Sequence, residues 1–388
     1  MSIEVPAGWS NRSLGSLIDF VNGFAFKPED WREAGTPIVR IQNLNGSDAF
    51  NYFEGTIPER YHVRAGDLLF CWSGSRGTSF GARKWQGPLG YLNQHIFRCV
   101  VSSDLDFNFA YFLLEGMTRA IEAEAHGGGG LVHIKKSEIV KFEARIPPLD
   151  EQRRIAEVLR SVDRAIAANR SALHQMVRAQ AATLHVAFEE TDWEPVKLGT
   201  LGRWQSGGTP SKADASLWNG DVPWVCPRDM KVPVVRRTES SVSSKAVGGA
   251  CKIAPKGSLM IVVRGMILAK AIPTAITAMD ATFNQDIKAF QPNERVLPKF
   301  IQLCLQHQER ELLRLVNTAT HGTKKLDADT IAEIEIPLPD LAVQQELSDA
   351  VADMDLAMAG YGEEHIRLTT LKNAVRDDLF SGRVRVSA

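Results

Sequence analysis

The two halves of this sequence repeat the same motifs in the same order. Residues 7–17 (AGWSNRSLGSL) return as residues 191–201 (TDWEPVKLGTL), and the Asn-Gln-His triplet at 93–95 returns as Asn-Gln-Asp at 284–286. A repeat this long indicates duplication of a whole domain rather than an array of short repeats. We therefore expect two domains of one fold, and a target that also has two halves.

The composition is typical of a soluble globular protein. Of the 388 residues, 44% are hydrophobic and 23% are charged, so each half is large enough to bury its own core. No apolar run reaches the roughly 18 residues that span a bilayer, and the N-terminal residues lack the features of a secretory signal. Five isolated cysteines indicate reduced thiols, and we expect a cytoplasmic protein with no membrane partner.

The charge is distributed unevenly along the chain. The net charge of −1 does not indicate a protein that binds nucleic acid over its whole surface. Basic residues nevertheless outnumber acidic ones in residues 193–335, whereas acidic residues prevail in residues 336–388. This pattern is compatible with DNA on one surface and a protein partner on another, and equally with ordinary surface variation.

Both halves combine short β-rich runs with single helical stretches. The expected boundaries place one mixed α/β domain at residues 1–145 and its copy at 191–335, with long helical regions at 146–190 and 336–388. We expect strands within 36–41, 67–72 and 94–100 and a helix at 107–125 in the first domain, and strands within 222–226, 257–263 and 286–291 and a helix at 298–316 in the second.

An Ile-Pro motif and a long helical stretch follow each domain. IPPLDEQRRI at 146–155 returns as IPLPDLAVQQEL at 336–347, and its prolines end the preceding strand. Apolar residues then recur in heptads through 151–188 and 343–380, which indicates a coiled-coil seam. The sequence predicts the fold class α+β, with two mixed domains joined by two long antiparallel helices. Polar seam residues are expected to set the register: Asn169, Gln180, His365 and Lys372.

The familiar catalytic motifs of phosphate loops, dinucleotide-binding folds, metalloproteases and serine hydrolases are missing from the sequence. Residues 127–130 are all glycine but lack the following Lys-Ser/Thr, so we expect a flexible loop there. Asp221, Asp229 and Lys231 only faintly resemble the acidic pair and lysine of a nuclease. The sequence does not indicate an enzyme, and no metal site is expected.

Three segments carry a resemblance to a known family. Residues 16–45, with their Gly-Phe-Ala-Phe-Lys core, and residues 202–231, with Ser-Gly-Gly-Thr-Pro-Ser, are similar to two varieties of target-recognition domain. Residues 146–163 resemble the central helical region of the same family, the specificity subunits of type I restriction-modification systems. The second helical copy departs from the pattern, since Val343 precedes Gln344 where glutamate is usual.

The resemblance implies a DNA-reading subunit without catalysis of its own. Each recognition domain would read one half of a split, asymmetric target in double-stranded DNA. The paired helices would set the unread gap and dock two methyltransferase subunits, and restriction (motor-nuclease) subunits would join them. No cofactor is expected in this chain, whereas the partner subunits would use S-adenosylmethionine, ATP and Mg.

Side-chain chemistry suggests which loops read DNA. Arg, Lys, Ser, Thr and His on glycine-bearing loops can reach base edges and phosphates. Five loops combine these features, at residues 73–84, 126–136, 206–212, 263–270 and 320–325. The candidate DNA-binding residues are Ser75, Arg76, Thr78, Arg83, Lys84, His133, Lys135, Lys136, Gly208, Thr209, Ser211, Lys212, Arg264, Lys270, His321, Thr323, Lys324 and Lys325.

Other readings stay open at this point. The triplets at 93–95 and 284–286 fit buried turn-capping at least as well as base recognition, and Trp9 and Trp193 fit packing anchors. The chain could also serve a fused methyltransferase-nuclease. A third alternative is a coiled-coil interaction protein that never reads bases, which DNA-binding assays of the assembled complex would distinguish.

Overall fold

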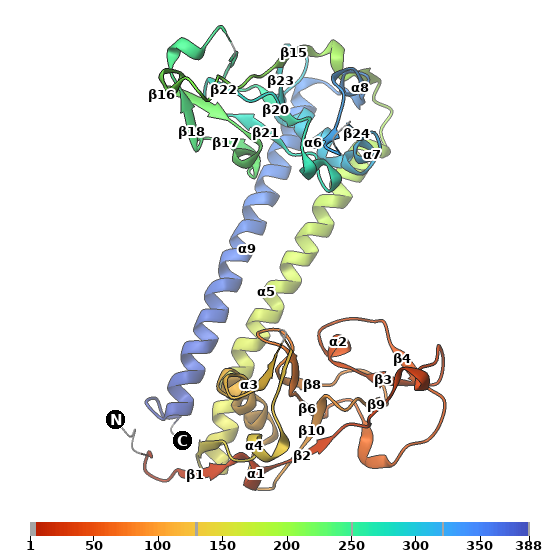
Figure 1. Cartoon of the computed structure of the whole chain (residues 1–388), viewed down its shortest axis with the longest axis vertical. Coiled ribbons are helices and arrows are strands. Elements are labelled where there is room, and N and C mark those ends of the chain that lie inside the picture. The colour runs from red at the N-terminus through yellow and green to blue at the C-terminus, as the bar shows by residue number, and fades with distance from the viewer. Residues whose placement is uncertain (1–4, 129–130, 250, 320–321, 387–388) are drawn as a thin grey trace. The chain divides into compact units, whose positions relative to one another are not determined.

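The computed structural model describes residues 5–128, 131–249, 251–319 and 322–386 (Figure 1). The chain forms two compact units: unit 1 comprises residues 1–171 and 363–388, and unit 2 comprises residues 172–362. Two helices of 41 residues, α5 (Leu149–Glu189) and α9 (Leu341–Ser381), each contribute to both units. Their bounds confirm the long helices that the heptads predict. No helix in the described ranges is long and apolar enough to cross a membrane.

Unit 1 is a mixed α/β domain. Its central four-stranded antiparallel sheet has the order β2-β10-β6-β8, and a second sheet, β4-β3-β9-β5, contains the parallel pair β3–β9. The strands are β1 (Ser10–Ser13), β2 (Ile18–Asn22), β3 (Thr36–Val39), β4 (Asn51–Phe53), β5 (His62–Val63), β6 (Leu68–Cys71), β7 (Ser73–Ser75), β8 (Gly81–Lys84), β9 (Gly90–Leu92), β10 (Ile96–Val101), β11 (His126–Gly128), β12 (Leu131–His133) and β13 (Glu143–Ile146), and the helices are α1 (Leu14–Leu17), α2 (Ile41–Leu44), α3 (Phe107–Ala123) and α4 (Lys136–Ile139).

Unit 2 repeats this plan. A five-stranded sheet has the order β15-β23-β20-β21-β17, and the parallel pair β16–β22 lies in a second sheet. The strands are β14 (Pro195–Lys197), β15 (Gly202–Ser206), β16 (Trp218–Val225), β17 (Val234–Val235), β18 (Ser240–Val242), β19 (Ile253–Ala254), β20 (Leu259–Val262), β21 (Thr274–Thr277), β22 (Ala281–Phe283), β23 (Ile287–Pro292), β24 (Asn317–Thr318), β25 (Lys324–Lys325) and β26 (Glu335–Pro337), and the helices are α6 (Pro298–His307), α7 (Glu309–Arg314) and α8 (Ala328–Ala332).

Two local expectations need correction. The strand expected within residues 36–41 ends at Val39, because the Asn43 side chain accepts the Arg40 amide at 3.0 Å and starts α2 instead. The helix expected at 298–316 is broken at Gln308, which leaves the helical conformation and donates its side-chain amide to the carbonyl of Glu335. By contrast α3 matches its prediction, since Asp106 caps the amides of Asn108 and Phe109.

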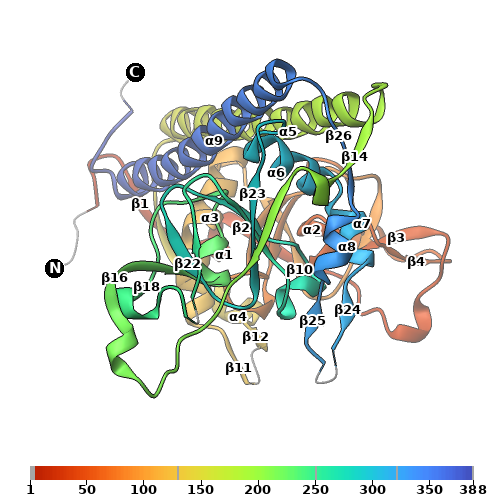
Figure 2. The same cartoon turned by 90° about the horizontal axis from the view of Figure 1, so that it is seen from above.

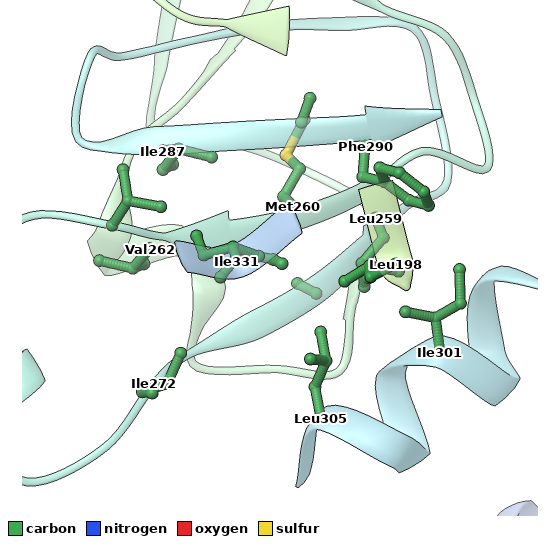
Figure 3. Close-up of a cluster of buried hydrophobic side chains, with 14 of the residues drawn as sticks. Leu198, Leu259, Met260, Val262, Ile272, Ile287, Phe290, Ile301, Leu305 and Ile331 are labelled. Carbon is green, nitrogen blue, oxygen red and sulfur yellow. The ribbon is translucent and has the colours of Figure 1, made fainter. Parts of the chain in front are cut away.

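Each unit has its own core, to which both long helices contribute. Figure 3 shows part of the unit 2 core, where side chains of β20 such as Leu259 meet Phe290 of β23 and Leu305 of α6. In unit 1, Ile155 of α5 and Leu379 of α9 are buried in the same cluster. Burial of this apolar surface, at roughly 25 cal/mol per Å², holds the helices onto the sheets.

The two helices pack antiparallel within each unit. In unit 1, Lys372 of α9 pairs with Asp163 of α5 at 2.8 Å, and in unit 2, Gln180 of α5 donates to Asp355 of α9 at 2.8 Å. These contacts agree with a register-setting role for Lys372 and Gln180. The expectation for His365 is wrong, because its side chain is exposed. None of the described residues offers it a polar partner, so the imidazole is better solvated by water.

Candidate nucleic-acid interface

A three-residue turn lies at the centre of the candidate loops in unit 1. We call residues 93–95, which join β9 to β10, the central turn of unit 1. The backbone of Asn93 donates to the carbonyl of Val39 at 3.1 Å, and the carbonyl of His95 accepts the amide of Trp72 at 3.3 Å. The carbonyl of Trp72 in turn accepts the amide of Ile134 at 3.1 Å. These bonds bring together segments that are far apart in the sequence.

Unit 2 builds the same arrangement around its own central turn, residues 284–286. Asn284 donates to Val225 at 3.0 Å, and the carbonyl of Asp286 accepts the amide of Val263 at 2.8 Å. The carbonyl of Val263 accepts the amide of Leu326 at 2.9 Å. The duplication therefore extends to individual backbone hydrogen bonds of the candidate site.

One glycine in each unit permits this close packing. A Cβ at Gly23 would lie 2.1 Å from the carbonyl oxygen of Asn93, and a Cβ at Gly207 would lie 2.2 Å from that of Asn284. Any other residue would have to displace backbone. Glycine at these positions is thus a requirement of the central turns.

Two predicted loops of unit 1 meet beside the turn as a small sheet. In the order β11-β12-β7, residue Ser73 pairs with His133, and Ser75 pairs with Leu131. The side chains of Ser75 and His133 are exposed there. The structure thus brings parts of the candidate loops 73–84 and 126–136 next to each other.

The three predicted loops of unit 2 also meet at the central turn. Thr209 donates its hydroxyl to Oε1 of Gln285. Arg264 forms a β-bridge with Lys325, and the amide of Gly265 donates to Lys324 at 3.0 Å. Figure 2 shows the β24–β25 hairpin that carries Lys324 and Lys325. Residues 320 and 321, including the candidate His321, lie outside the described residues.

Some predicted residues of unit 1 are placed elsewhere or engaged. Arg83 and Lys84 lie at the end of β8 that pairs with the start of β6, since Lys84 pairs with Leu68. Trp72 follows the other end of β6. The Lys84 ammonium lies 2.8 Å from Oδ1 of Asn108 and 4.5 Å from the ring centroid of Tyr111, and burial lowers its pKa. The structure does not bring these two cations to the central turn.

The remaining candidates divide into engaged and unengaged groups. Arg76 donates to the carbonyls of Glu122 and Ala125 at the end of α3, and Lys136 pairs with Asp19 at 2.8 Å. Lys324 donates to Thr318 at 2.9 Å and Lys325 pairs with Asp327. The hydroxyl of Thr78 donates to Ser75, and the carbonyls of Gly208, Ser211 and Thr323 accept local hydrogen bonds. The candidate cations that are exposed and have no side-chain hydrogen bond or ion pair with another described residue are Lys135, Lys212, Arg264 and Lys270.

Arg40, which no sequence motif singles out, directly follows Val39 beside the central turn of unit 1. The Arg40 guanidinium lies 4.7 Å from the Trp31 ring centroid and donates to Asn51 at 2.8 Å. Burial lowers the pKa of His95, and the charges of Arg40 and His133 lower it further. No pattern in the sequence signals this, since the two segments meet only through the fold.

The described residues contain no cluster of His, Cys, Asp and Glu that could hold a metal ion. All five cysteines are described, buried and unpaired, and burial raises the pKa of Cys71 to about 12. Such a thiol is protonated at neutral pH and unsuited to nucleophilic attack.

A family model described as "Type I restriction modification DNA specificity domain" matches residues 6–176 and again residues 190–359. These two matches cover well over half of the chain. The chain belongs to this family. The recognition of type I specificity subunits from the sequence is confirmed.

Several type I specificity subunits are similar to the chain. It is 34% identical over 172 residues to the EcoR124I/EcoR124II specificity subunit of Escherichia coli, covering 44% of this chain and 43% of that one. It is 29% identical to the EcoBI specificity subunit of Escherichia coli over 50% of this chain and 43% of the relative. The chain thus spans less than half the length of these relatives in the matched regions.

The fold is shared with solved specificity subunits. The type I restriction-modification S subunit from M. genitalium matches with a TM-score of 0.60 and 17% identity, covering 98% of both chains. A chain from a structure titled "Structural basis underlying complex assembly andconformational transition of the type I R-M system" matches with a TM-score of 0.62 and 16% identity, covering 98% of this chain and all of that one. The α+β fold with two mixed domains and two long helices is therefore confirmed.

Proposed function

We propose that this chain is a DNA-reading subunit of a type I restriction-modification complex, with no catalytic role of its own. The observation that carries the proposal is the duplicated central turn. In each unit the same backbone hydrogen bonds gather glycine-bearing loops, but those loops present different side chains in the two units. Two equivalent scaffolds with different reading residues suit a target with two different half-sites.

Base recognition would come from the exposed loop side chains. Ser75 and His133 in unit 1 and Arg264 in unit 2 can donate hydrogen bonds to base edges in the major groove. Charged contacts to phosphates would set the position of each unit on the duplex. The chain would bind double-stranded DNA without a cofactor.

Partner subunits would supply the chemistry. The paired helices would dock two methyltransferase subunits that use S-adenosylmethionine, and restriction subunits would add ATP- and Mg-dependent cleavage. We expect this complex in the cytoplasm, where the DNA that it modifies would be found. The helices would also set the length of the unread gap between the half-sites.

Methylome sequencing of a strain that expresses the chain with its methyltransferase subunits tests the proposal. We expect N6-methyladenine in one split motif. Replacing residues 1–145 with a foreign recognition domain should change only one half of that motif. A replacement that alters both halves, or a complex that binds random and genomic DNA equally, would contradict the proposal.

A change in helix length tests the gap separately. Four residues inserted between Ala181 and Ala182 in α5 add about 6 Å to the helix, and two base pairs of DNA occupy about 7 Å. The unread gap should therefore lengthen by about one or two base pairs while both half-sites stay unchanged. An unchanged gap in an active complex would show that the helices do not set the spacing.

A further inference from the structure

The central turns are the part of the candidate interface that the two units share. The loops around them differ: Ser73 of unit 1 pairs with His133 where unit 2 has Arg264 opposite Lys325. The turns themselves keep asparagine and glutamine at the first two positions. If the two units read different bases, an element that both units share is better suited to contact the sugar-phosphate backbone, which is the same in every DNA sequence.

The asparagine of each turn is buried, and the one in unit 2 caps its turn. Asn93 and Asn284 are each only 6% exposed. The side chain of Asn284 accepts the Asp286 amide at 3.1 Å and donates to the Asp286 carboxylate at 3.0 Å. These bonds confirm that turn-capping explains the asparagine of unit 2. They do not explain why glutamine follows it.

The side-chain oxygens of the two glutamines have different surroundings. Oε1 of Gln94 is buried and has no hydrogen-bond partner among the described residues. Oε1 of Gln285 accepts the Thr209 hydroxyl, and the rest of its side chain is exposed. In neither residue is the amide nitrogen Nε2 bonded to another described residue. Each turn thus has an unused donor that suits a hydrogen-bond acceptor.

Basic side chains lie near both turns, next to one carboxylate in unit 2. In unit 1, Arg40 directly follows Val39, whose carbonyl accepts the Asn93 amide, and burial together with the Arg40 charge lowers the pKa of His95. In unit 2 the exposed Arg264 donates its backbone amide to the carbonyl of Asp286, and Lys325 is its bridge partner. The Asp286 carboxylate accepts a hydrogen bond from Asn284, and Lys325 pairs with Asp327. The guanidinium groups of Arg40 and Arg264 are therefore the cations that favour an acceptor with negative charge.

We propose that Gln94 and Gln285 each donate a hydrogen bond from Nε2 to a phosphate oxygen of the DNA backbone. The two turns are then sequence-independent anchors that position the reading loops over the bases. This inference rests on the proposed DNA-reading function. It adds two residues that the loop composition did not identify.

The test uses the chain assembled with its methyltransferase subunits. Binding is measured on a duplex that carries the methylated motif and on a random-sequence duplex of the same length. Gln94→Ala and Gln285→Ala should each weaken binding to both duplexes by about 3- to 10-fold, because one hydrogen bond is lost. Gln94→Glu should weaken binding further, since its charge opposes phosphate. Gln94→Lys should restore binding and raise the salt slope by about one.

Matched glutamines serve as controls. Gln86 is exposed and lies just after the end of β8 at Lys84, away from the central turn of unit 1. Gln291 is exposed near the end of β23 that is farther from the central turn of unit 2. The same substitutions at these positions should leave binding unchanged. The lysine and glutamate variants separate a phosphate contact from a loss of folding, because a merely structural glutamine would tolerate neither charge.

Three outcomes would overturn the anchor. One is a Gln94→Ala complex that methylates a motif altered at one base, which would indicate a base contact. Another is an unchanged DNA affinity in all Gln94 and Gln285 variants while the wild-type complex binds DNA. That result would contradict the phosphate anchor but leave the proposed DNA-reading function standing. If the wild-type complex binds no DNA, the proposed function and the anchor both fail.

Discussion

The first turns of α5 and α9 share a buried glutamine and differ in the residue before it. Gln152 and Gln344 are 1% and 0% exposed. Each donates Nε2 to two backbone carbonyls and accepts one backbone amide at Oε1. The partners are Asp104, Pro147 and Asp106 for Gln152, and Arg295, Pro339 and Leu297 for Gln344, all at 2.7–3.0 Å.

The preceding residue distinguishes the two units. The Glu151 carboxylate accepts Trp9 Nε1 at 3.0 Å and the Arg385 guanidinium at 2.6 and 2.8 Å. Val343 cannot make these bonds, and with Trp193 it lines a largely apolar cavity of about 620 Å³ in unit 2. The first turns of the two helices thus share the bonds that satisfy buried backbone groups, but only the turn in unit 1 has the charged contact. Unsatisfied backbone groups are costly in any fold, whereas an ion pair can be replaced by apolar residues.

Removing the shared glutamine should have the largest effect. Gln152→Leu and Gln344→Leu each leave three backbone groups without partners, so each should lower the free energy of unfolding by about 2–4 kcal/mol. Urea unfolding of the single variants measures this. Gln345→Leu is the control, because Gln345 is exposed and bonds only Asp349. A loss below about 1 kcal/mol at Gln344 alone would break the equivalence of the two turns.

Removing the unit 1 carboxylate should have a smaller, pH-dependent effect. Hydrogen bonds from Arg385 lower the pKa of Glu151 below its ordinary value, aided by Trp9 and opposed by burial. At pH 7, Glu151→Gln should cost about 1–2 kcal/mol. Since the folded pKa is depressed, this stabilisation is complete above the unfolded pKa and is lost as the pH falls toward the folded one. The difference from wild type in urea unfolding should therefore shrink below about pH 4.

The matching change in unit 2 should not help. Val343→Glu places a carboxylate in the cavity that Glu346 also lines, and no arginine lines that cavity among the described residues. The variant should be less stable than wild type at pH 7. A stabilised variant would mean that the two first turns are electrostatically interchangeable after all.

The contacts between α5 and α9 also differ between the units, and their removal should have an effect of intermediate size on stability. Asp163 and Asp355 stand equally far after Gln152 and Gln344, but Asp163 pairs with Lys372 and Asp355 with Gln180. Lys372 also pairs with Glu115 at 2.8 Å and its side chain is only 12% exposed. Lys372→Gln should cost about 1 kcal/mol by thermal or urea unfolding. Gln180→Lys, without a second acid, should change stability by less than about 0.5 kcal/mol.

Filling the unit 2 cavity should have a small effect of the opposite sign. Val343→Leu adds one methylene to an apolar lining and should stabilise the chain by up to about 0.8 kcal/mol. Glu151→Leu at the corresponding position of unit 1 should destabilise it, because Trp9 and Arg385 lose their acceptor. If urea unfolding showed both leucine variants to be stabilised, or both to be destabilised, the two helix starts would not differ in the way proposed.

Much of the fold could be predicted because local patterns encode burial. The heptads placed the long helices within two residues of their observed ends at both termini, since every third or fourth apolar residue must face a partner. The break at Gln308 could not be predicted, because its cause is the distant carbonyl of Glu335. His365 was misassigned for the same reason, since its heptad position says nothing about the groups that face it.

The candidate site divides in the same way. The sequence by itself determined that the molecule has two equivalent halves, an antiparallel helix pair and glycine-bearing loops rich in hydrogen-bond donors. Only the tertiary structure decided which donors remain available. Arg76 donates to carbonyls at the end of α3, whereas no described residue accepts a hydrogen bond from the amide nitrogen of Gln94 or Gln285. Apolar periodicity is a property of neighbouring residues, but a polar group's partner comes from wherever the chain folds back. Its role is therefore fixed by contacts that no local pattern contains.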